Sequence, residues 1–162
     1  MIKLIPAKVN NLVPLENLAK EIWHECYTDL LGESQVEYMI KNFQSNEAFV
    51  SQINNGYEYY FLEYDGEVAG YVGLLQEEDK LFLSKLYLKS RFYGRGIAQM
   101  LLNVLVDRLK ENGLIEMYLT VNKGNLRAIR AYERFGFIRT DSIITDIGNG
   151  FVMDDYVYTY RI

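Results

Sequence analysis

The turn Tyr93–Ala98 contains two glycines, Gly94 and Gly96, and lies between a strand-like run and a helical pattern. The first turn of a helix leaves backbone N–H groups without partners, and the helix dipole adds partial positive charge there. Glycine has no Cβ, so a ligand can approach such a backbone closely. This arrangement attracts phosphate, and Arg95 could add charge. The turn therefore predicts a nucleotide-like ligand, although a glycine pair also serves simply to tighten a turn.

A second group of chemically useful side chains follows further along the chain. Asn125, Ala128 and Tyr132 have the spacing of residues that share one helix face. Ala128 leaves room between the two polar groups, while Leu126 and Ile129 point elsewhere and are expected in the core. A tyrosine hydroxyl, with an ordinary pKa of about 10, can act as a general acid. The alternative is a half-buried aromatic ring with its hydroxyl in water.

Other reactive groups are few. Cys26 is the only cysteine, which excludes an intrachain disulfide and a thiolate metal cluster, and we expect no metal. Its place in a helical pattern with only His24 nearby argues against a nucleophile, and His24 is expected at or near the surface. The acidic residues that precede the central strand or lie near the last one are expected to be solvated loop charges; they are Glu77, Glu78, Asp79, Asp154 and Asp155.

The elements around the glycine turn explain how these groups meet. A strand Leu81–Leu88 precedes it, and a helix from Ile97 to about Glu111 and a strand Leu114–Val121 follow. A strand–helix–strand unit of this length implies a parallel pair with a right-handed crossover. Because ligands bind beyond the carboxyl ends of parallel strands, the turn and the loop Asn122–Asn125 should face one crevice.

The rest of the chain completes an α/β fold. Ser34 is expected to cap a helix, and Asp65-Gly66 indicates a tight hairpin turn. The remaining expected elements are a strand over residues 2–5, helices over Leu12–Tyr27, Ser34–Phe43, Asn46–Ile53 and Asn125–Phe135, and strands over Tyr57–Tyr64, Glu67–Leu75, Phe137–Ile144 and Phe151–Ile162. The sum is a mixed, largely antiparallel seven-stranded sheet with one central parallel strand pair and helices on both faces, in a single domain over residues 1–162.

Composition narrows the class of protein. The chain has 162 residues, 49% of them hydrophobic and 24% charged, as in an ordinary globular domain. A net charge of −5 argues against nucleic acid as a partner and suits a cationic substrate. The apolar start is too short for a signal peptide, and no run approaches the roughly 18 apolar residues of a membrane helix. With a single cysteine, these features lead us to expect a cytoplasmic protein without a membrane partner.

Together the two motifs resemble the GNAT superfamily of N-acetyltransferases. The resemblance is carried by Tyr93–Ala98 and Asn125–Phe137, is sharpest over residues 81–137, and extends weakly over the whole chain. The family pattern is Gln/Arg-x-x-Gly-x-Gly/Ala; here Tyr93 stands at the Gln/Arg place, which matters little if the loop acts through its backbone. The stretch Trp23–Leu31 adds similarity to PaiA-type bacterial polyamine acetyltransferases.

The resemblance implies acetyl-CoA as cosubstrate. Main-chain groups of Leu86 and Leu88 would pair with the pantetheine arm, the glycine turn and helix start would hold the pyrophosphate, and Tyr132 would sit near the sulfur as general acid. The residues that the resemblance assigns to the cofactor are Leu86, Tyr87, Leu88, Tyr93, Gly94, Arg95, Gly96, Ile97, Ala98, Gln99 and Asn125.

The acceptor implied by the resemblance is a primary amine that attacks the thioester directly. Phe82 stands where part of the family has a glutamate base, and Ser84 follows, so we expect proton removal through ordered water or binding of the neutral amine. The family places its acceptor site between the early helices, the strand 81–88 and the loop joining the last two strands, which here offer Trp23, Tyr27, Tyr57, Tyr59, Phe82 and Asp154 or Asp155. Aromatic rings and carboxylates can hold an ammonium chain by cation–π and ionic contacts, although most of these rings are expected to serve the core. The substrate-binding candidates are Trp23, Tyr27, Phe82 and Ser84. A polyamine is favoured over a protein N-terminus or lysine.

Two other functions were considered. A non-catalytic sensor of acetyl-CoA stays open. A nicotinamide-dependent enzyme is disfavoured, because the glycines lack the G-x-G-x-x-G spacing. Tyr156, Tyr158 and Tyr160 alternate onto one strand face, which could be a homodimer surface or one side of the core.

Overall fold

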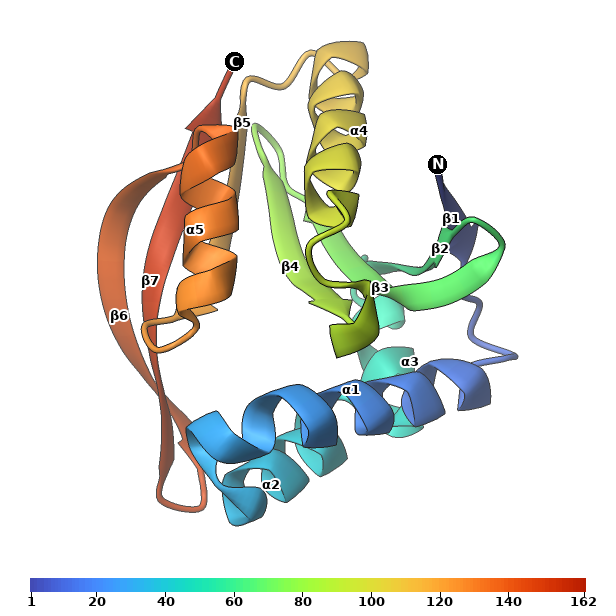
Figure 1. The fold of residues 1–162 in the computed structure, drawn as a ribbon, viewed down its shortest axis with the longest axis vertical. Coiled ribbons are helices and arrows are strands. Elements are labelled where there is room, and N and C mark those ends of the chain that lie inside the picture. Colours follow the sequence, from blue (N-terminus) through green and yellow to red (C-terminus); the bar gives the residue numbers. More distant parts are fainter. The chain divides into compact units, whose positions relative to one another are not determined.

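The computed structural model describes residues 1–162 and shows seven strands and five α-helices (Figure 1). Their bounds are β1 Ile2–Pro6, α1 Val13–Leu31, α2 Glu33–Phe43, α3 Asn46–Asn54, β2 Glu58–Tyr64, β3 Glu67–Gln76, β4 Leu81–Leu88, the 3-10 turn η1 Ser90–Phe92, α4 Ile97–Glu111, β5 Glu116–Asn122, α5 Leu126–Phe135, β6 Ile138–Gly148 and β7 Phe151–Arg161. The strand order is β1-β2-β3-β4-β5-β7-β6.

One parallel pair interrupts an otherwise antiparallel sheet. Strands β4 and β5 run parallel, with Leu81 opposite Met117 and Phe82 opposite Tyr118. The pairs β1–β2, β2–β3, β5–β7 and β6–β7 are antiparallel. The predicted mixed α/β fold, with seven strands and one parallel pair, is therefore confirmed.

Contacts between Cα atoms divide the chain into two compact units. Unit 1 comprises Met1–Leu75 and Lys85–Ile97, and unit 2 comprises Gln76–Ser84 and Ala98–Ile162. The assignment of the whole chain to a single domain stays a prediction. No helix is both long enough and apolar enough to cross a membrane.

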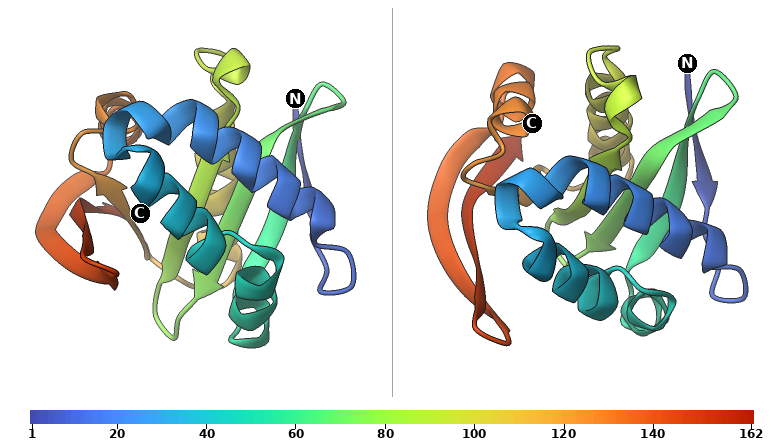
Figure 2. Two further views of the ribbon diagram at one scale, coloured as in Figure 1. Left: turned by 90° about the horizontal axis from the view of Figure 1, so that it is seen from below. Right: turned by 60° about the horizontal axis from the view of Figure 1, so that its bottom comes forward.

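In unit 1, the helices α1, α2 and α3 lie across one face of the strands β2 and β3 (Figure 2). The predicted hairpin is confirmed, because Asp65 and Gly66 both have positive φ, 50° and 86°. Strand β3 also approaches the end of β4 very closely. A Cβ built on Gly70 would lie 1.9 Å from the carbonyl oxygen of Tyr87, so only glycine fits there.

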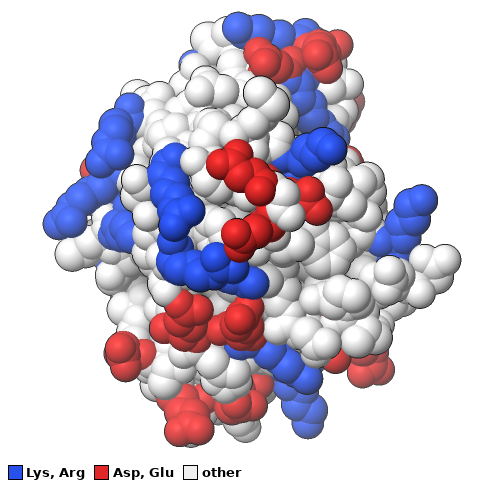
Figure 3. All heavy atoms as spheres, turned by 45° about the vertical axis from the view of Figure 1, so that its right-hand side comes forward, with Lys and Arg blue, Asp and Glu red and all other residues white.

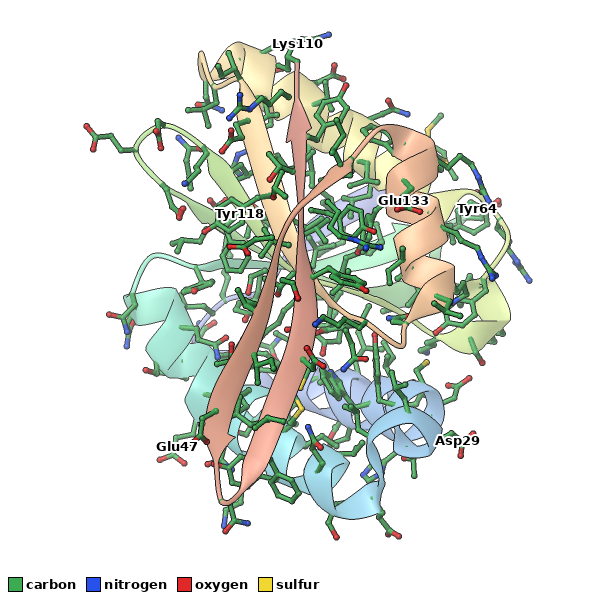
Figure 4. All side chains as sticks on the ribbon, turned by 90° about the vertical axis from the view of Figure 1, so that its left-hand side faces the viewer. Asp29, Glu47, Tyr64, Lys110, Tyr118 and Glu133 are labelled. Atoms are coloured by element: carbon green, nitrogen blue, oxygen red, sulfur yellow. The ribbon has the colours of Figure 1, made fainter.

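In unit 2, α5 lies beside β7 and β6. Figure 4 shows Glu133 on α5, and the hydroxyl of Tyr158 on β7 donates a hydrogen bond of 2.9 Å to it. Tyr160 reaches the same helix, since a Cβ on Gly136 would lie 3.4 Å from its ring. Tyr158 is fully buried, so this tyrosine serves the core of the unit.

Three local predictions need correction. Ser34 does not cap α2: the helix begins at Glu33, and its N-cap is Gly32, whose φ of 86° ends α1 at the same point. Leu126 is 55% exposed instead of being in the core, because it stands at the first turn of α5; Ile129 is buried, as expected. Strand β6 extends to Gly148, beyond the expected end at Ile144, because it pairs with β7 almost to the hairpin tip.

On the face shown in Figure 3, lysines and arginines alternate with aspartates and glutamates instead of forming one continuous basic strip. That face therefore carries no extended field of a single sign.

Candidate cofactor and acceptor site

The glycine turn in unit 1 presents open backbone. Gly94 and Gly96 both have φ of 75°, and no atom lies within 4 Å of where a Cβ on either would stand. Arg95 is exposed, and its guanidinium lies 5.3 Å from the ring of Phe92. Ile97, at the first residue of α4, is buried. The first residue of α4 is therefore buried while the backbone of the turn is accessible, and this arrangement suits a phosphate group.

The side chain of Tyr93 contacts helix α1. Its hydroxyl and the thiol of Cys26 are 2.9 Å apart and share a hydrogen bond. The same thiol lies 3.7 Å from the carbonyl oxygen of Leu88. Cys26 therefore links helix α1 to the turn and to the end of β4.

The end of β4 has backbone groups facing away from β3. The N–H of Lys89 donates to the carbonyl of Ala69 on β3 at 2.8 Å, and the carbonyl of Tyr87 faces Gly70 of the same strand. Since backbone groups of successive residues alternate between the two edges of a strand, those of Leu86 and Leu88 point to the other edge. These are the two residues whose main chain was predicted to pair with a pantetheine arm.

In unit 2, a hydrogen bond joins the first turn of α4 to the middle of α5. Gln99 on α4 donates from its side-chain amide to the carbonyl oxygen of Ala131 on α5 at 3.0 Å. Asn125 is the N-cap of α5, and its side-chain oxygen accepts from the N–H of Ala128 at 3.4 Å. The side chain of Asn125 therefore orders the local backbone at the start of α5.

Tyr132 is buried on α5, only 8% exposed. Its ring packs edge-on against Phe137, with centroids 5.6 Å apart. Burial raises the pKa of its hydroxyl to about 12, against a smaller lowering by the charge of Arg127. Tyr132 is therefore protonated throughout the neutral range and has a proton to donate.

The acceptor candidates of unit 1 lie in a buried aromatic cluster. Trp23 is 2% exposed, and its ring lies 4.5 Å from that of Tyr27 and 5.2 Å from that of Tyr87. The indole N–H donates to the hydroxyl of Tyr71, which donates to Gln44. These bonds fix the cluster firmly. The role of Trp23 and Tyr27 in acceptor binding stays a prediction.

Lys85 is a buried lysine that the sequence analysis did not predict. Its ammonium donates to the carbonyl of Phe43 at 2.9 Å and to the side-chain oxygen of Gln52 at 3.0 Å. It also lies 5.0 Å from the ring centroids of Phe49 and Tyr59. Burial lowers the pKa of Lys85 to about 7. The alternation of residues along β4 does not predict that Lys85 is buried, because the carbonyl and the side-chain amide that accept its hydrogen bonds belong to α2 and α3.

In unit 2, the aromatic candidate Phe82 stacks on Tyr118. The rings are 4.7 Å apart and nearly parallel, at 11°. The hydroxyl of Tyr118 lies 2.8 Å and 2.9 Å from the two carboxylate oxygens of Glu77. Glu77 is thus a hydrogen-bonded group and not simply a solvated charge, whereas Glu78 and Asp79 are exposed, as expected.

Asp155 corrects the sequence analysis most clearly. It was expected to be a solvated charge, but it is 8% exposed, and its Oδ1 is buried without a hydrogen-bond partner. The neighbouring Asp154 is half exposed and pairs with Lys123 at 2.7 Å. Burial raises the pKa of Asp155 to about 6, with Asp154 raising it further and Lys123 lowering it. Asp155 is therefore a buried acid on the last strand, contrary to the solvated charge that the sequence predicted.

His24 lies at the surface of unit 1. Its Nε2 lies 2.9 Å from a carboxylate oxygen of Glu37, and both side chains are about half exposed. This contact joins α1 to α2 at the surface, in agreement with the expected surface position of the histidine.

With this geometry described, comparison with known proteins defines the class of protein. The family model described as "Acetyltransferase (GNAT) family" matches residues 17–137. The match covers most of the chain, and the protein belongs to the GNAT acetyltransferase family. The resemblance predicted from the two motifs is confirmed.

The chain is similar to two curated relatives in particular. It is 27% identical over 158 residues to a spermidine N(1)-acetyltransferase of Thermoplasma acidophilum, covering 94% of this chain and 96% of that protein. It is 32% identical over 85 residues to a spermine/spermidine N(1)-acetyltransferase of Bacillus subtilis, covering 47% of this chain and 56% of the relative. In the second case the match spans about half the length of the relative.

The fold has a match among solved structures. The crystal structure of the PaiA N-acetyltransferase from Thermoplasma acidophilum, in complex with coenzyme A, superimposes with a TM-score of 0.80 at 24% sequence identity. The superposition covers 100% of this chain and 99% of that one. The likeness confirms the GNAT fold.

Proposed function

We propose that this protein is an acetyl-CoA-dependent N-acetyltransferase that moves an acetyl group to a primary amine of a polyamine. The observation that carries the proposal is the open backbone of the glycine turn, where Gly94 and Gly96 run directly into the 15-residue helix α4. Membership of the GNAT family and the names of the two curated relatives support the acetyl donor and the acceptor class.

In this proposal the cosubstrate is held along one continuous segment of chain. The outward main-chain groups of Leu86 and Leu88 pair with the pantetheine arm as an added strand would. The N–H groups from Tyr93 to Gln99, at the positive end of α4, bind the pyrophosphate. Acetyl-CoA supplies the activated acyl group, and the protein supplies position and proton transfer.

Tyr132 is the proposed proton donor to the departing sulfur. An ordinary thiol has a pKa of about 8.5, well below the value of about 12 for Tyr132. Full transfer of the tyrosine proton is therefore uphill. We infer that the hydroxyl stabilises the thiolate by a hydrogen bond and gives up its proton only as the attacking nitrogen releases one.

The test is release of free thiol from acetyl-CoA in the presence of amines. We expect thiol release with spermidine, and loss of about 10²–10⁴-fold in kcat for Tyr132→Phe, with acetyl-CoA affinity nearly unchanged. Tyr160→Phe removes a half-buried hydroxyl on β7 and is the matched control. Binding of acetyl-CoA without thiol release for any amine or peptide would identify a sensor, and a response to peptide alone would identify a protein acetyltransferase.

A further inference from the structure

The glycine turn of unit 1 is buried at both ends and exposed in its middle. Phe92, before the turn, and Ile97, after it, are 2% and 1% exposed. Gly94, Arg95 and Gly96 lie between them and are exposed, and no atom lies within 4 Å of a Cβ built on either glycine. Glycine backbone has the widest conformational freedom, so holding these N–H groups in one arrangement for a ligand costs entropy unless a neighbouring residue restrains them. The affinity of the turn for phosphate therefore depends on the residue that leads into it.

Tyr93 leads into the turn, and its side chain is bonded to helix α1. Its hydroxyl lies 2.9 Å from the thiol sulfur of Cys26, and that thiol donates to the carbonyl oxygen of Leu88 at 3.7 Å. A thiol has a single proton to donate. Because that proton goes to Leu88, the hydroxyl of Tyr93 is the donor to the sulfur. One side chain of α1 is therefore bonded both to the start of the turn and to the end of β4.

Two further contacts join α1 to the segment before the turn. The ammonium of Lys89 lies 3.4 Å from a carboxylate oxygen of Glu21, whose side chain is 56% exposed. The hydroxyl of Ser90 donates to Glu25 in a contact that is also exposed. Exposed charged contacts of this kind contribute little, because water screens them. The partly buried bond at the tyrosine hydroxyl is therefore the contact that restrains the turn most strongly.

The first residue of the turn is also where this chain departs from its family pattern. That pattern has Gln or Arg at the place of Tyr93. A tyrosine side chain has only two χ angles, so a hydrogen bond at its tip fixes the ring at a low cost in entropy. The partner of the hydroxyl is the only cysteine of the chain, 67 residues away in sequence. The bonded pair of Cys26 and Tyr93 is therefore a feature of this chain and is not part of the family pattern.

From this geometry we propose that Cys26 is a positioning residue of the acetyl-CoA site. Through the hydroxyl of Tyr93 it holds the backbone N–H groups of the turn in the arrangement that takes the pyrophosphate, before the cosubstrate arrives. The inference rests on the proposed function for the place of the pyrophosphate. In this role the thiol takes no part in the transfer of the acetyl group. Every residue in the argument belongs to unit 1.

A restraint on the turn changes the affinity for the cosubstrate and leaves the chemical step unaffected. Preorganisation lowers the entropy lost on binding, so its removal weakens the ligand that the turn holds. The acetyl group is carried at the opposite end of the pantetheine arm from the pyrophosphate. With spermidine as acceptor, we therefore expect Tyr93→Phe and Cys26→Ala to raise the KM for acetyl-CoA by about tenfold and to keep kcat within about twofold of the wild type.

Calorimetry with coenzyme A, and with pantetheine, which lacks the pyrophosphate, tests the proposal directly. We expect Tyr93→Phe and Cys26→Ala each to weaken coenzyme A binding by about tenfold, as the loss of one hydrogen bond allows. Tyr93→Phe should bind pantetheine within about threefold of the wild type, because this ligand does not reach the turn. Cys26→Ser keeps a donor and an acceptor at this position and should restore coenzyme A affinity to within about threefold of the wild type.

Two control variants remove comparable groups elsewhere in unit 1. Tyr64→Phe removes the hydroxyl of a half-buried tyrosine whose ring lies 6.3 Å from that of Phe92. Glu21→Gln breaks the exposed ion pair between α1 and Lys89. Both controls should bind coenzyme A within about twofold of the wild type. Losses in the controls as large as those in the test variants would overturn the proposal.

A double variant shows whether the two side chains act as a pair. Cys26→Ala and Tyr93→Phe remove the same bond, so the double variant should bind coenzyme A as weakly as either single variant, within about twofold. If the two losses multiply instead, the residues act separately and the proposal is overturned. Equal losses toward coenzyme A and pantetheine in Tyr93→Phe would also overturn it, since a general loss of structure affects both ligands.

The outcomes distinguish this inference from the proposed function. If the wild type acetylates spermidine while Cys26→Ala and Tyr93→Phe bind coenzyme A within about twofold of it, the inference fails and the proposed function stands. If the wild type binds coenzyme A but acetylates no amine, the proposed function fails. In that case weaker binding of coenzyme A by the two variants still supports the inference, and unchanged binding overturns it.

Discussion

The buried lysine of unit 1 makes the stability of this protein depend on pH in a defined way. The folded-state pKa of Lys85 is about 7, whereas an unfolded lysine titrates near about 10.4. Between these values the unfolded chain binds more protons than the folded chain. The free energy of unfolding therefore rises with pH in this window, and the penalty of burying the ammonium is fully present below it.

The size of this effect follows from the two pKa values. The contribution of Lys85 to the free energy of unfolding should increase by about 2 kcal/mol from about pH 7 to about pH 9. For a chain of this length that corresponds to about 4–8 °C in Tm. The buried tyrosines titrate above this range, since burial raises the pKa of Tyr59, Tyr71 and Tyr132.

The variant Lys85→Met isolates this contribution. Methionine removes the charge and leaves both former acceptors paired, because Phe43 O also accepts from Gln52, and Gln52 Oε1 also accepts from Tyr59. We expect the difference in unfolding free energy between wild type and Lys85→Met to change by about 2 kcal/mol across the window, in favour of the wild type at higher pH.

Urea unfolding at a series of pH values measures this difference directly. Lys20→Met is the control, because Lys20 is 52% exposed on α1, where its ammonium lies 3.8 Å from a carboxylate oxygen of Glu16. Its curve should run parallel to that of the wild type. Parallel curves for wild type and Lys85→Met as well would refute the reasoning, since Lys85 would then titrate alike in the folded and unfolded chains.

Two glycine substitutions test the backbone arguments. Gly96→Ala places a Cβ on a residue with φ 75° and should weaken acetyl-CoA binding in calorimetry. Gly113→Ala is the control, because Gly113 has φ 69° and equally open surroundings. Each variant should lose about 1 kcal/mol of stability, but Gly113→Ala should leave binding unchanged. Equal affinities in the two variants would contradict a phosphate site at the turn. Gly70→Ala should destabilise the protein by about 3 kcal/mol or more in thermal unfolding, because its Cβ would overlap the Tyr87 carbonyl oxygen; Gly66→Ala, with open space around it, is the control, and a similar small loss in both would contradict the close approach.

Local sequence determined the helices, the strands and the cofactor part of the candidate site. Glycine at positive φ and alternation of apolar residues are properties of a few neighbouring residues, so the glycine turn and the Asp65-Gly66 hairpin were predictable. The same reasoning failed at Ser34, where Gly32 ends one helix and begins the next. Whether Gly32 or Ser34 caps α2 depends on the directions of both α1 and α2, and Ser34 itself does not specify these directions.

Tertiary structure alone decided which charged groups are buried. Lys85 is buried because α2 and α3 bring a backbone carbonyl and an amide oxygen to it, and Asp155 is buried although the chemically identical Asp154 beside it is half exposed. Desolvation depends on every atom that excludes water from a group, and most of those atoms come from distant parts of the chain. For this reason the sequence indicated the turn for the cofactor, and only the folded chain showed which of the two adjacent aspartates is buried.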